Sequence, residues 1–238
     1  MRCYDSAVRS TWPGMFITFE GLDGCGKSTQ LEKLAAALRE LGHKVVTTRE
    51  PGGTEIGDRI RSLLLNSRTL GLDPWSELAL MFAARAQHIA EVILPALQAG
   101  SIVLCDRFTD SSEAYQGGGR ELGSEPVLAL HRTLCGGIMP NLTIWMDSDV
   151  AASVARARRR NRSHTGRNGA GKLDEGRFER ESREFFQRVR HAYAAIALRE
   201  PKRVTRINAR RSITAVHRDI LETVEKRLQL RHAHLSKP

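Results

Sequence analysis

Cysteine is scarce in this chain of 238 residues, and its four cysteines are far apart in the sequence. They are Cys3, Cys25, Cys105 and Cys135, and no two of them form a Cys-x-x-Cys pair. This spacing argues against a disulfide framework and against a zinc site, so we expect reduced thiols in a cytoplasmic protein. Cys105 lies in an apolar run and is expected to be a core residue.

Long hydrophobic runs are also missing. No apolar stretch approaches the roughly 20 residues that a membrane-spanning helix needs, so we expect no membrane association. Residues 1–14 carry Arg2 and Arg9 but no apolar run of the kind found in secretory signals. We expect them to form a disordered extension, or to precede the true start of the protein, for which Met15 is a candidate.

Aromatic residues make up only 5% of the chain, and 27 acidic residues are outnumbered by 37 basic ones, which gives a net charge of +10. A strongly basic protein can bind nucleic acid, or it can have a pocket for two phosphorylated ligands. The excess is concentrated between Arg156 and Arg190, where twelve Arg or Lys residues face five Asp or Glu residues. Because no RNA-recognition or zinc-finger signature accompanies this segment, we expect no nucleic-acid partner.

The most informative motif that is present spans residues 21–28, Gly-Leu-Asp-Gly-Cys-Gly-Lys-Ser. It fits the pattern Gly-x-x-x-x-Gly-Lys-Ser/Thr of a phosphate-binding loop. A β-prone segment at 15–20 precedes it and a helical pattern at 29–41 follows, which disfavours an ordinary Gly-rich turn. Inward-pointing backbone N–H groups and the helix N-terminus together can hold a polyphosphate.

The motif predicts which residues bind ATP. Lys27 is expected to reach the β- and γ-phosphates, and the Ser28 hydroxyl is expected to hold Mg²⁺. The helix N-terminus and Lys27 both favour a thiolate at Cys25, so we expect Cys25 to react faster with thiol reagents than Cys105. The predicted nucleotide-binding residues are Gly21, Leu22, Asp23, Gly24, Cys25, Gly26, Lys27, Ser28 and Thr29.

Strand-like and helix-like segments alternate along the chain. Strands are predicted at 15–20, 44–48, 101–106, 142–147 and 204–208, and helices at 29–41, 54–65, 75–99 and 213–228. This order predicts an α/β fold, with a five-stranded parallel sheet covered by helices on both faces. Pro95 is expected to kink the third helix or to begin a new turn.

Apolar spacing predicts the buried faces of the first two helices. The expected buried positions are Leu31, Leu34, Ala35, Leu38 and Leu41 in the first, and Ile56, Ile60, Leu63 and Leu64 in the second. The polar, Gly-rich segment 163–172 is predicted to be a mobile loop. This loop belongs to an expected lid at about 157–177. The lid is part of a single predicted domain at 15–228. A C-terminal tail is predicted at 229–238.

Functional residues of a parallel sheet gather at the carboxyl ends of its strands, where Asp106 and Asp147 are expected. Asp106 follows a buried strand and could position Mg²⁺, directly or through water. Arg107 has the planar fork that suits a phosphate. Taken alone, the pair favours a helix cap at Asp106 and a surface ion pair at Arg107.

Four motifs taken together resemble the thymidylate kinase family in order and spacing. They are residues 19–29, residues 48–54 (Thr-Arg-Glu-Pro-Gly-Gly-Thr), residues 82–87 (Phe-Ala-Ala-Arg-Ala-Gln), and residues 106–108 with 114–119. The resemblance extends from Met15 to about Leu228. It implies a P-loop NTPase fold with a mobile lid, and a homodimer that uses ATP and Mg²⁺ to phosphorylate dTMP to dTDP in dTTP synthesis.

The resemblance also implies roles for individual residues. Arg61 and Arg107 match the positions that hold the monophosphate, and Asp23 matches an acidic position near the deoxyribose 3′-hydroxyl and the reacting phosphates. Arg85 matches the donor to the thymine carbonyl. Ser112 and Gln116 match positions that close over the base, and Tyr115 matches an aromatic residue near the sugar.

Two departures from the family pattern concern aromatic positions. The family usually has Phe four residues before the pocket arginine, where it stacks on thymine, but this chain has Met81 there and Phe82 one residue later. Either Met81 packs on the base or Phe82 takes its place, and plain core packing is an equal alternative for each. Phe108 stands where Tyr or His is common, which is expected to matter little.

The phosphate-binding loop has no basic residue between Gly21 and Gly26, so the resemblance implies that arginines from the lid assist phosphoryl transfer. The candidates are Arg158, Arg159, Arg160, Arg162, Arg167 and Lys172, of which Arg160 and Arg162 are preferred. Solvated surface charges are the alternative for each of them.

Two other functions stay open at the level of sequence. One is a kinase for another pyrimidine nucleotide or for a deoxynucleoside, although Arg61 and Arg107 together favour a phosphorylated acceptor. The other is a nucleic-acid-binding ATPase, which the net charge suggests and which would show steeply salt-dependent binding.

Overall fold

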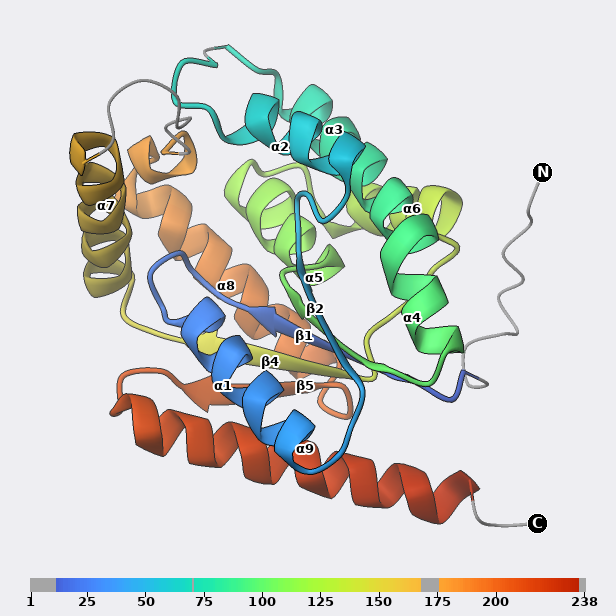
Figure 1. The fold of residues 1–238 in the computed structure, drawn as a ribbon. Coiled ribbons are helices and arrows are strands. Elements are labelled where there is room, and N and C mark those ends of the chain that lie inside the picture. Colours follow the sequence, from blue (N-terminus) through green and yellow to red (C-terminus); the bar gives the residue numbers. More distant parts are fainter. Residues whose placement is uncertain (1–11, 70, 168–175, 236–238) are drawn as a thin grey trace.

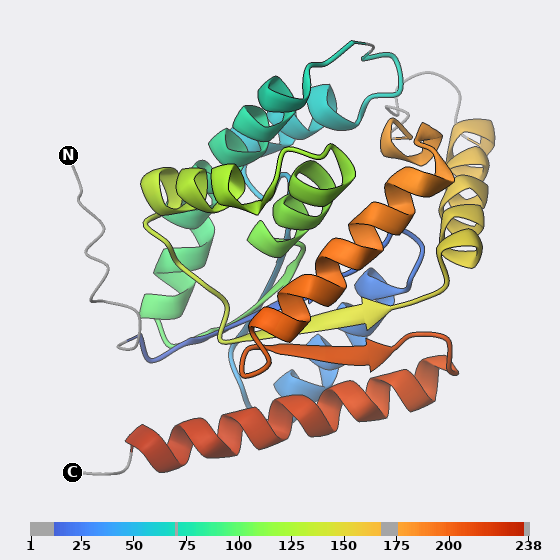
Figure 2. The same cartoon turned by 180° about the vertical axis from the view of Figure 1, so that it is seen from behind.

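The structure, a computed structural model, describes residues 12–69, 71–167 and 176–235, without the side chains of 162–167 and 231–235. Its centre is a parallel sheet of five strands in the order β2-β3-β1-β4-β5, as Figures 1 and 2 show from two sides. The strands are β1 (Met15–Glu20), β2 (Val45–Arg49), β3 (Ile102–Asp106), β4 (Leu142–Asp147) and β5 (Val204–Asn208). The predicted five-stranded parallel α/β sheet is confirmed.

Helices cover both faces of this sheet. One face carries α1 (Lys27–Glu40) and α9 (Ile213–Leu235), which lie below the sheet in Figure 1. The other carries α3 (Pro74–His88), α4 (Leu94–Gln98), α5 (Thr109–Ser112), α6 (Ser124–Cys135) and α8 (Arg183–Arg199). Beyond them, α2 (Glu55–Leu65) packs on α3, and α7 (Val150–Arg167) stands at the carboxyl edge of the sheet.

Strand β1 shows how the sequence pattern builds the core. All six of its residues are buried, as expected for a central strand of a parallel sheet. Alternate side chains point to opposite faces, so Ile17 and Phe19 join the cluster under α1 and α9, while Phe16 packs with Phe82 on the other face. Because β1 lies between β3 and β4, the strand order changes direction there and leaves a crevice at its carboxyl end.

The helix predicted at 75–99 is divided into three segments. A π-helical segment, η2 (Ile89–Ile93), separates α3 from α4. Pro95 has no N–H group to donate to the carbonyl of Glu91, and a wider turn just before it accommodates that loss. By length and composition alone Pro74–Gln98 could cross a membrane. However, it buries Glu77 and Arg85 in ion pairs, as a core helix of a folded domain does.

Other boundaries and faces differ from the predictions. Helix α9 extends to Leu235, past the predicted end at 228, and α7 extends to Arg167, so the first part of the segment predicted as a loop at 163–172 is helical. Residues 1–11 and 168–175 lie outside the described residues.

The buried faces of the first two helices are narrower than predicted. Leu41, Ile56 and Leu63 are half exposed instead of buried, because α1 ends at Glu40 and α2 lies at the periphery with only a narrow stripe against α3.

The burial of His131 in α6 predicts that the protein becomes less stable at acidic pH. The ring is buried, its Nδ1 lies 3.0 Å from Thr109 Oγ1, and it packs edge-on against Phe108 at 5.9 Å between ring centroids. Burial lowers the pKa of His131 to about 4, from 6.5. Below pH 6.5 the His131 ring is protonated in the unfolded chain but stays neutral in the folded one. Proton binding therefore stabilises the unfolded state, and the free energy of unfolding decreases as the pH falls from 6.5 to 4.

We expect acidification from pH 7 to pH 5 to lower the free energy of unfolding by about 2 kcal/mol through protonation of His131 in the unfolded chain. Urea unfolding of the wild type and of His131→Gln at both pH values measures it. The variant should start less stable at pH 7 and should lose less on acidification. Equal losses in the two proteins would show that His131 does not titrate in this way.

Candidate active site

The phosphate-binding loop follows β1 and requires glycine for two reasons, its backbone conformation and its close packing against α7. Gly21, Gly24 and Gly26 have φ angles of 132°, 78° and 99°, which side chains of L residues rarely adopt. At Gly24 space is also limiting, because a Cβ atom would lie 2.3 Å from the carbonyl oxygen of Ser153 on α7. Glycine therefore allows both the turn of the loop and the close approach of α7.

Lys27 is the first residue of α1, and its ammonium group is buried inside the loop. It donates hydrogen bonds to the carbonyl oxygens of Gly21 and Leu22 at 3.1 and 3.0 Å, and it lies 3.9 Å from Asp23 Oδ1. The predicted phosphate-binding cation is thus held at the centre of the loop by main-chain acceptors.

Ser28 and Asp106, the two predicted metal-binding residues, meet where the start of α1 lies beside the end of β3. Asp106 ends β3 and pairs in register with Phe19 of β1, and its Oδ2 accepts a hydrogen bond of 2.8 Å from Ser28 Oγ. Magnesium prefers hard oxygen ligands and is bound in proteins through one or two carboxylates together with substrate phosphates and water. A hydroxyl and a carboxylate beside a phosphate-binding loop fit that preference, although no cluster of three or more His, Cys, Asp or Glu ligands occurs in the described part of the chain.

Arg107 points into the interior of the site, so a surface ion pair is the wrong interpretation of it. Its side chain is 14% exposed and donates to Asp23 Oδ1 at 2.8 Å, to Ser111 Oγ at 2.9 Å and to the Tyr115 hydroxyl at 3.1 Å. Its φ of 76° is unusual for a residue with a side chain and aims the guanidinium group inward. Asp106 is also no helix cap, because Phe108 holds the N-cap position of α5.

Asp23 is surrounded by cations at this end of the site. Burial alone would raise the pKa of Asp23, but Arg107 and then Lys27 outweigh burial and hold that pKa below its ordinary value, with a smaller contribution from Arg160. The carboxylate is therefore ionised at neutral pH.

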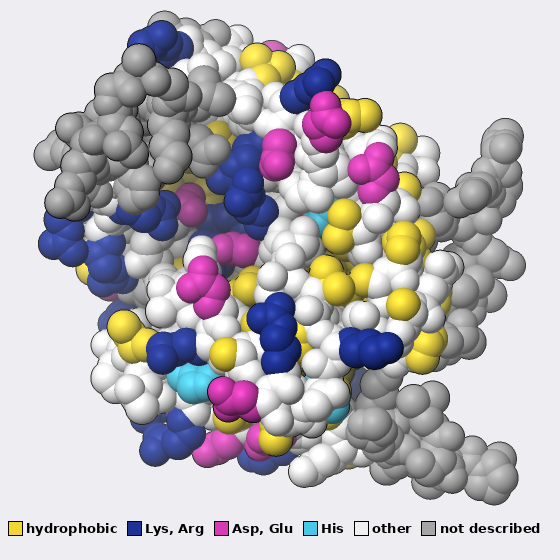
Figure 3. Space-filling model, viewed as in Figure 1, with side chains coloured by type: hydrophobic (Ala, Val, Ile, Leu, Met, Phe, Trp, Pro, Cys, Tyr) yellow, Lys and Arg dark blue, Asp and Glu magenta, His cyan; other side chains and the backbone are white. Residues whose placement is uncertain are grey.

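Asp23 and Arg107 line a cleft that encloses about 730 Å³ of space when the part open to solvent is included. Figure 3 shows Lys and Arg side chains gathered around the hollow. The cleft brings together the predicted residues Asp23, Arg61, Met81, Arg85, Arg107, Ser112, Tyr115, Gln116 and Arg160.

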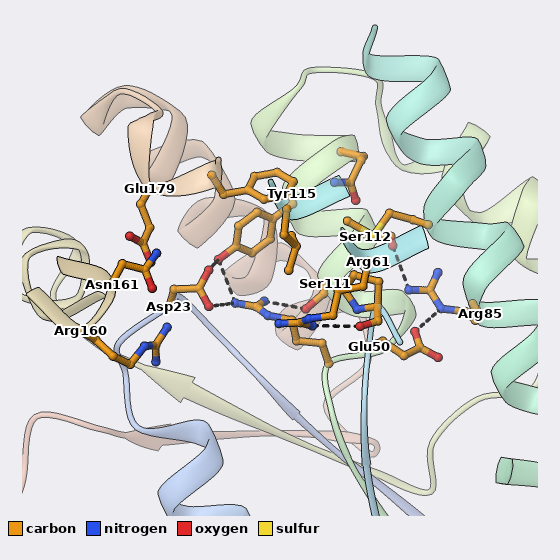
Figure 4. Close-up of a pocket in the computed structure, with 16 residues that line it drawn as sticks. Asp23, Glu50, Arg61, Arg85, Ser111, Ser112, Tyr115, Arg160, Asn161 and Glu179 are labelled. Carbon is orange, nitrogen blue, oxygen red and sulfur yellow. Dashed lines mark hydrogen bonds and ion pairs between the residues drawn. The ribbon is translucent and has the colours of Figure 1, made fainter. Parts of the chain in front are cut away.

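Figure 4 shows that the labelled side chains of the cleft lie toward two opposite ends. Asp23, Arg160, Asn161 and Glu179 lie toward one end, and Arg85 and Ser112 lie toward the other. The residues that sequence analysis did not assign to the site are Glu50, Pro51, Leu65, Ser111, Asn161, Phe178 and Glu179. Glu50 and Pro51 belong to the motif at 48–54, so that signal was present, whereas nothing in the sequence marked Phe178 or Glu179.

Arg85 occupies the end of the cleft away from the phosphate-binding loop and is almost fully buried. Its Nε donates to Glu50 Oε2 at 2.7 Å and its Nη2 donates to Ser112 Oγ at 3.0 Å. Its Nη1 is buried without a hydrogen-bond partner among the described residues. Since buried donors are rarely left unpaired, Nη1 is a candidate donor to a ligand in the cleft.

The structure distinguishes Met81 from Phe82. Met81 lines the cleft, whereas Phe82 has no exposed surface and packs in the core with Leu78 and Phe108. The Arg85 guanidinium group lies over the Phe82 ring at 4.7 Å, so Phe82 supports Arg85 from the side of the core. The two residues are therefore not equivalent toward a ligand.

The arginines of α7 have different environments. Arg156 donates to the carbonyl of Gly24 at 2.7 Å and fastens α7 to the phosphate-binding loop, and Arg158 donates to the carbonyl of Glu179 at 2.9 Å. Arg160 lines the cleft. The side chains of Arg162 and Arg167 and the whole of Lys172 lie outside the described residues.

The expectation of a thiolate at Cys25 is wrong. Cys25 is 5% exposed, and burial raises the pKa of its thiol despite the Lys27 ammonium nearby. Burial also raises the pKa of Cys105 well above its ordinary value. The sequence showed the cation and the helix end beside Cys25 but not its removal from water, which is the larger effect.

A second hollow lies at the same edge of the sheet, at the ends of β4 and β5. It is lined by Asp147, Arg206, Asn208 and Arg210. Asp147 is almost fully buried and forms ion pairs with Arg190 at 2.7 Å and with Arg206 at 2.5 Å. The expected position of Asp147 at a strand end is confirmed, and its carboxylate orients two arginines there.

Comparisons with known proteins agree with this geometry. A family model described as thymidylate kinase matches residues 19–220. The thymidylate kinase of Pelotomaculum thermopropionicum is 47% identical over 213 residues, which cover 90% of this chain and 94% of that protein. That of Pseudomonas putida strain GB-1 is 49% identical over 207 residues, covering 87% and 93%.

A solved structure agrees as well. The crystal structure of thymidylate kinase from Ehrlichia chaffeensis is similar with a TM-score of 0.69 and 34% sequence identity, covering 89% of this chain and 98% of that one. The matched region includes the phosphate-binding loop, Asp106, Arg107 and the arginine at the far end of the cleft. The chain belongs to the thymidylate kinase family.

Proposed function

We propose that this protein transfers the γ-phosphoryl group of ATP to dTMP and forms dTDP and ADP, in the synthesis of dTTP. The observation that carries the proposal is the cleft with two ends. One end has Arg107 and Arg160 beside the phosphate-binding loop, and the other has the guanidinium group of Arg85, which carries only hydrogen-bond donors. A nucleotide has the same polarity, with an anionic phosphate at one end and a hydrogen-bonding base at the other.

In this assignment dTMP lies along the cleft. Arg61 and Arg107 hold its phosphate, and Arg85 donates to the thymine carbonyl, with Met81, Ser112 and Gln116 around the base. Tyr115 is placed at the sugar, because its hydroxyl joins Arg107 at 3.1 Å while its ring packs against Phe178. Asp23, close to Arg107, is placed near the 3′-hydroxyl and the reacting phosphates.

ATP is placed on the other side of the phosphate-binding loop. The main-chain N–H groups from Gly21 to Thr29 face its phosphates, and Lys27 exchanges its bonds to main-chain carbonyls for bonds to the β- and γ-phosphates. The hollow between β4 and β5 is suited to its base, because Arg206 and Asn208 offer hydrogen-bonding groups there. Ser28 and Asp106 would hold Mg²⁺, which when bound neutralises charge on the β- and γ-phosphate oxygens.

The chemistry asks little of the protein beyond positioning and charge. The accepting phosphate of dTMP is already an anion, so no general base has to remove a proton. The protein must align two anions for in-line transfer, stabilise the developing charge and exclude water. Lys27 and Arg107 provide positive charge, Arg160 and Arg162 are the lid arginines proposed to assist, and the lid is proposed to close over the cleft.

We place the enzyme in the cytoplasm as a homodimer. Free thiols at Cys25, Cys105 and Cys135 suit a reducing compartment. The neighbouring helices α2, α3 and α6 carry half-exposed apolar side chains that a second copy could cover, namely Ile56, Leu63, Trp75 and Leu134. Figure 3 shows yellow apolar side chains over the region of α3 and α4.

A coupled assay of ADP release from ATP and Mg²⁺ tests the proposed function. We expect release to depend on dTMP and not on thymidine, because thymidine lacks the phosphate that Arg61 and Arg107 hold. Release that depends on thymidine would assign a deoxynucleoside kinase instead. Release that depends on DNA or RNA and declines steeply with salt would assign a nucleic-acid-binding ATPase.

The different positions of Met81 and Phe82 predict different effects of substitution. Met81→Phe is expected to preserve or tighten dTMP binding, because a ring at the cleft wall can stack on the base. Phe82→Ala is expected to cost about 3 to 5 kcal/mol of stability, as for other buried aromatic residues. Calorimetric titration with dTMP and thermal unfolding separate the two effects.

Met81→Ala serves as the matched truncation at the neighbouring position. It should weaken dTMP binding more than it lowers the melting temperature. The assignment is reversed if a well-folded Phe82→Ala protein loses most of its affinity for dTMP while Met81→Ala binds it normally.

A further inference from the structure

Glu77, near the start of α3, is a fully buried carboxylate that joins three segments of the chain. Its Oε2 accepts hydrogen bonds from Arg177 Nη2 at 2.6 Å and from Arg120 Nη2 at 3.1 Å. Its Oε1 accepts a hydrogen bond of 2.8 Å from the side-chain amide of Gln116. Arg177 is itself anchored, since its Nε donates to the carbonyl of Leu64 at 2.5 Å. The carboxylate is therefore held in place on both sides.

This contact determines which way the Gln116 amide points. A glutamine amide has a donor side, the NH₂ group, and an acceptor side, the carbonyl oxygen. A carboxylate paired with two arginines can only accept, so only the NH₂ group of Gln116 can face it. Gln116 lines the cleft, and its carbonyl oxygen is the atom left to accept a hydrogen bond from a ligand there.

Gln116 and Arg85 both line the cleft, where the free amide oxygen of Gln116 is an acceptor and the guanidinium group of Arg85 carries only donors. Thymine and uracil carry the complementary pair, the N3–H donor beside the O4 acceptor. Cytosine carries the opposite pair, because its N3 accepts and its N4 amino group donates. An inverted Gln116 amide would present NH₂ instead of oxygen and would match N3 of cytosine.

We propose that Glu77 is a positioning residue that sets the pyrimidine specificity of this enzyme, by holding the Gln116 amide with its oxygen toward the base. The inference rests on the proposed function, since it concerns the base of the accepting nucleotide. Glu77 touches no substrate and acts only through Gln116. A neutral glutamine at position 77 could present either oxygen or NH₂ to Gln116, so the Gln116 amide would be free to invert.

The test compares Glu77→Gln with Arg120→Gln in the full-length chain. Arg120→Gln is the matched control, because it removes an ion pair of the same carboxylate and leaves the bond to Gln116 in place. The measured quantities are kcat/KM for dTMP, dUMP and dCMP, together with thermal unfolding. In Glu77→Gln we expect the ratio of kcat/KM for dTMP over dCMP to decrease about tenfold or more.

Two ratios serve as internal controls. The dTMP over dUMP ratio should stay unchanged in Glu77→Gln, because both bases carry the same N3–H and O4 groups. Both ratios should stay unchanged in Arg120→Gln. An unchanged dTMP over dCMP ratio in a folded Glu77→Gln protein overturns the inference, and so does an equal decrease in Arg120→Gln, which would indicate a general effect of charge.

A further variant covers the case in which Glu77→Gln does not fold. Gln116→Met removes the acceptor and keeps a side chain of similar length, so it should lower the dTMP over dCMP ratio as well. An unchanged ratio there overturns the inference. Failure of the proposed function itself is distinguishable, because the wild-type enzyme would then show no preference for dTMP.

Discussion

Lys27→Met is expected to reduce kcat by about a thousandfold or more, because single cations that stabilise phosphoryl transfer contribute factors of roughly 10³ to 10⁵. The Lys27 ammonium is 3.0 to 3.1 Å from two main-chain carbonyls of the loop, at the place where the β- and γ-phosphates are proposed to bind. Methionine keeps the apolar stem of the side chain and removes only the charge. Steady-state ADP release measures kcat, and thermal unfolding checks that the fold is intact.

Lys33→Met is the matched control, since Lys33 lies on the same helix and is exposed. It should leave kcat unchanged and should alter the stability of the protein only slightly. A Lys27→Met enzyme that keeps more than about a tenth of the wild-type kcat would be incompatible with a cation acting on the transferred group.

Arg107→Ala has the second largest expected effect. It should raise KM for dTMP and lower kcat, with a combined loss in kcat/KM of about 10² to 10⁴, because the phosphate contact is lost in the ground state and in the transition state. Arg107→Lys keeps the charge but loses the planar fork that reaches Asp23, Ser111 and Tyr115, so only part of the activity should return. Initial rates over a range of dTMP concentrations separate KM from kcat.

Arg59→Ala is the control for Arg107→Ala. Arg59 forms an exposed ion pair with Glu55 at 2.7 Å, and such pairs contribute little to stability. Its removal should not alter the kinetics. If Arg107→Ala leaves KM and kcat for dTMP at their wild-type values, then Arg107 does not hold the accepting phosphate.

The sequence by itself determined the architecture and predicted where the site lies. Alternating strand-like and helix-like segments specify a parallel sheet, because the spacing of apolar residues within each segment indicates whether it is a strand or a helix and which side of it is buried. The phosphate-binding loop is equally local, since its glycines and Lys27 lie within eight consecutive residues. Its strand-loop-helix context predicts a nucleotide site at the carboxyl edge of the sheet.

Only the tertiary structure decided how distant residues act on one another. Met81 and Phe82 share a helix and an apolar character, and only the packing of α3 shows which of them faces the cleft. Glu77 lies 39 residues before Gln116 and 100 residues before Arg177, so no local pattern could reveal the contacts of its carboxylate. Cys25 shows the same limit for electrostatics, because its cationic neighbour is local in sequence whereas its removal from water depends on the fold around it.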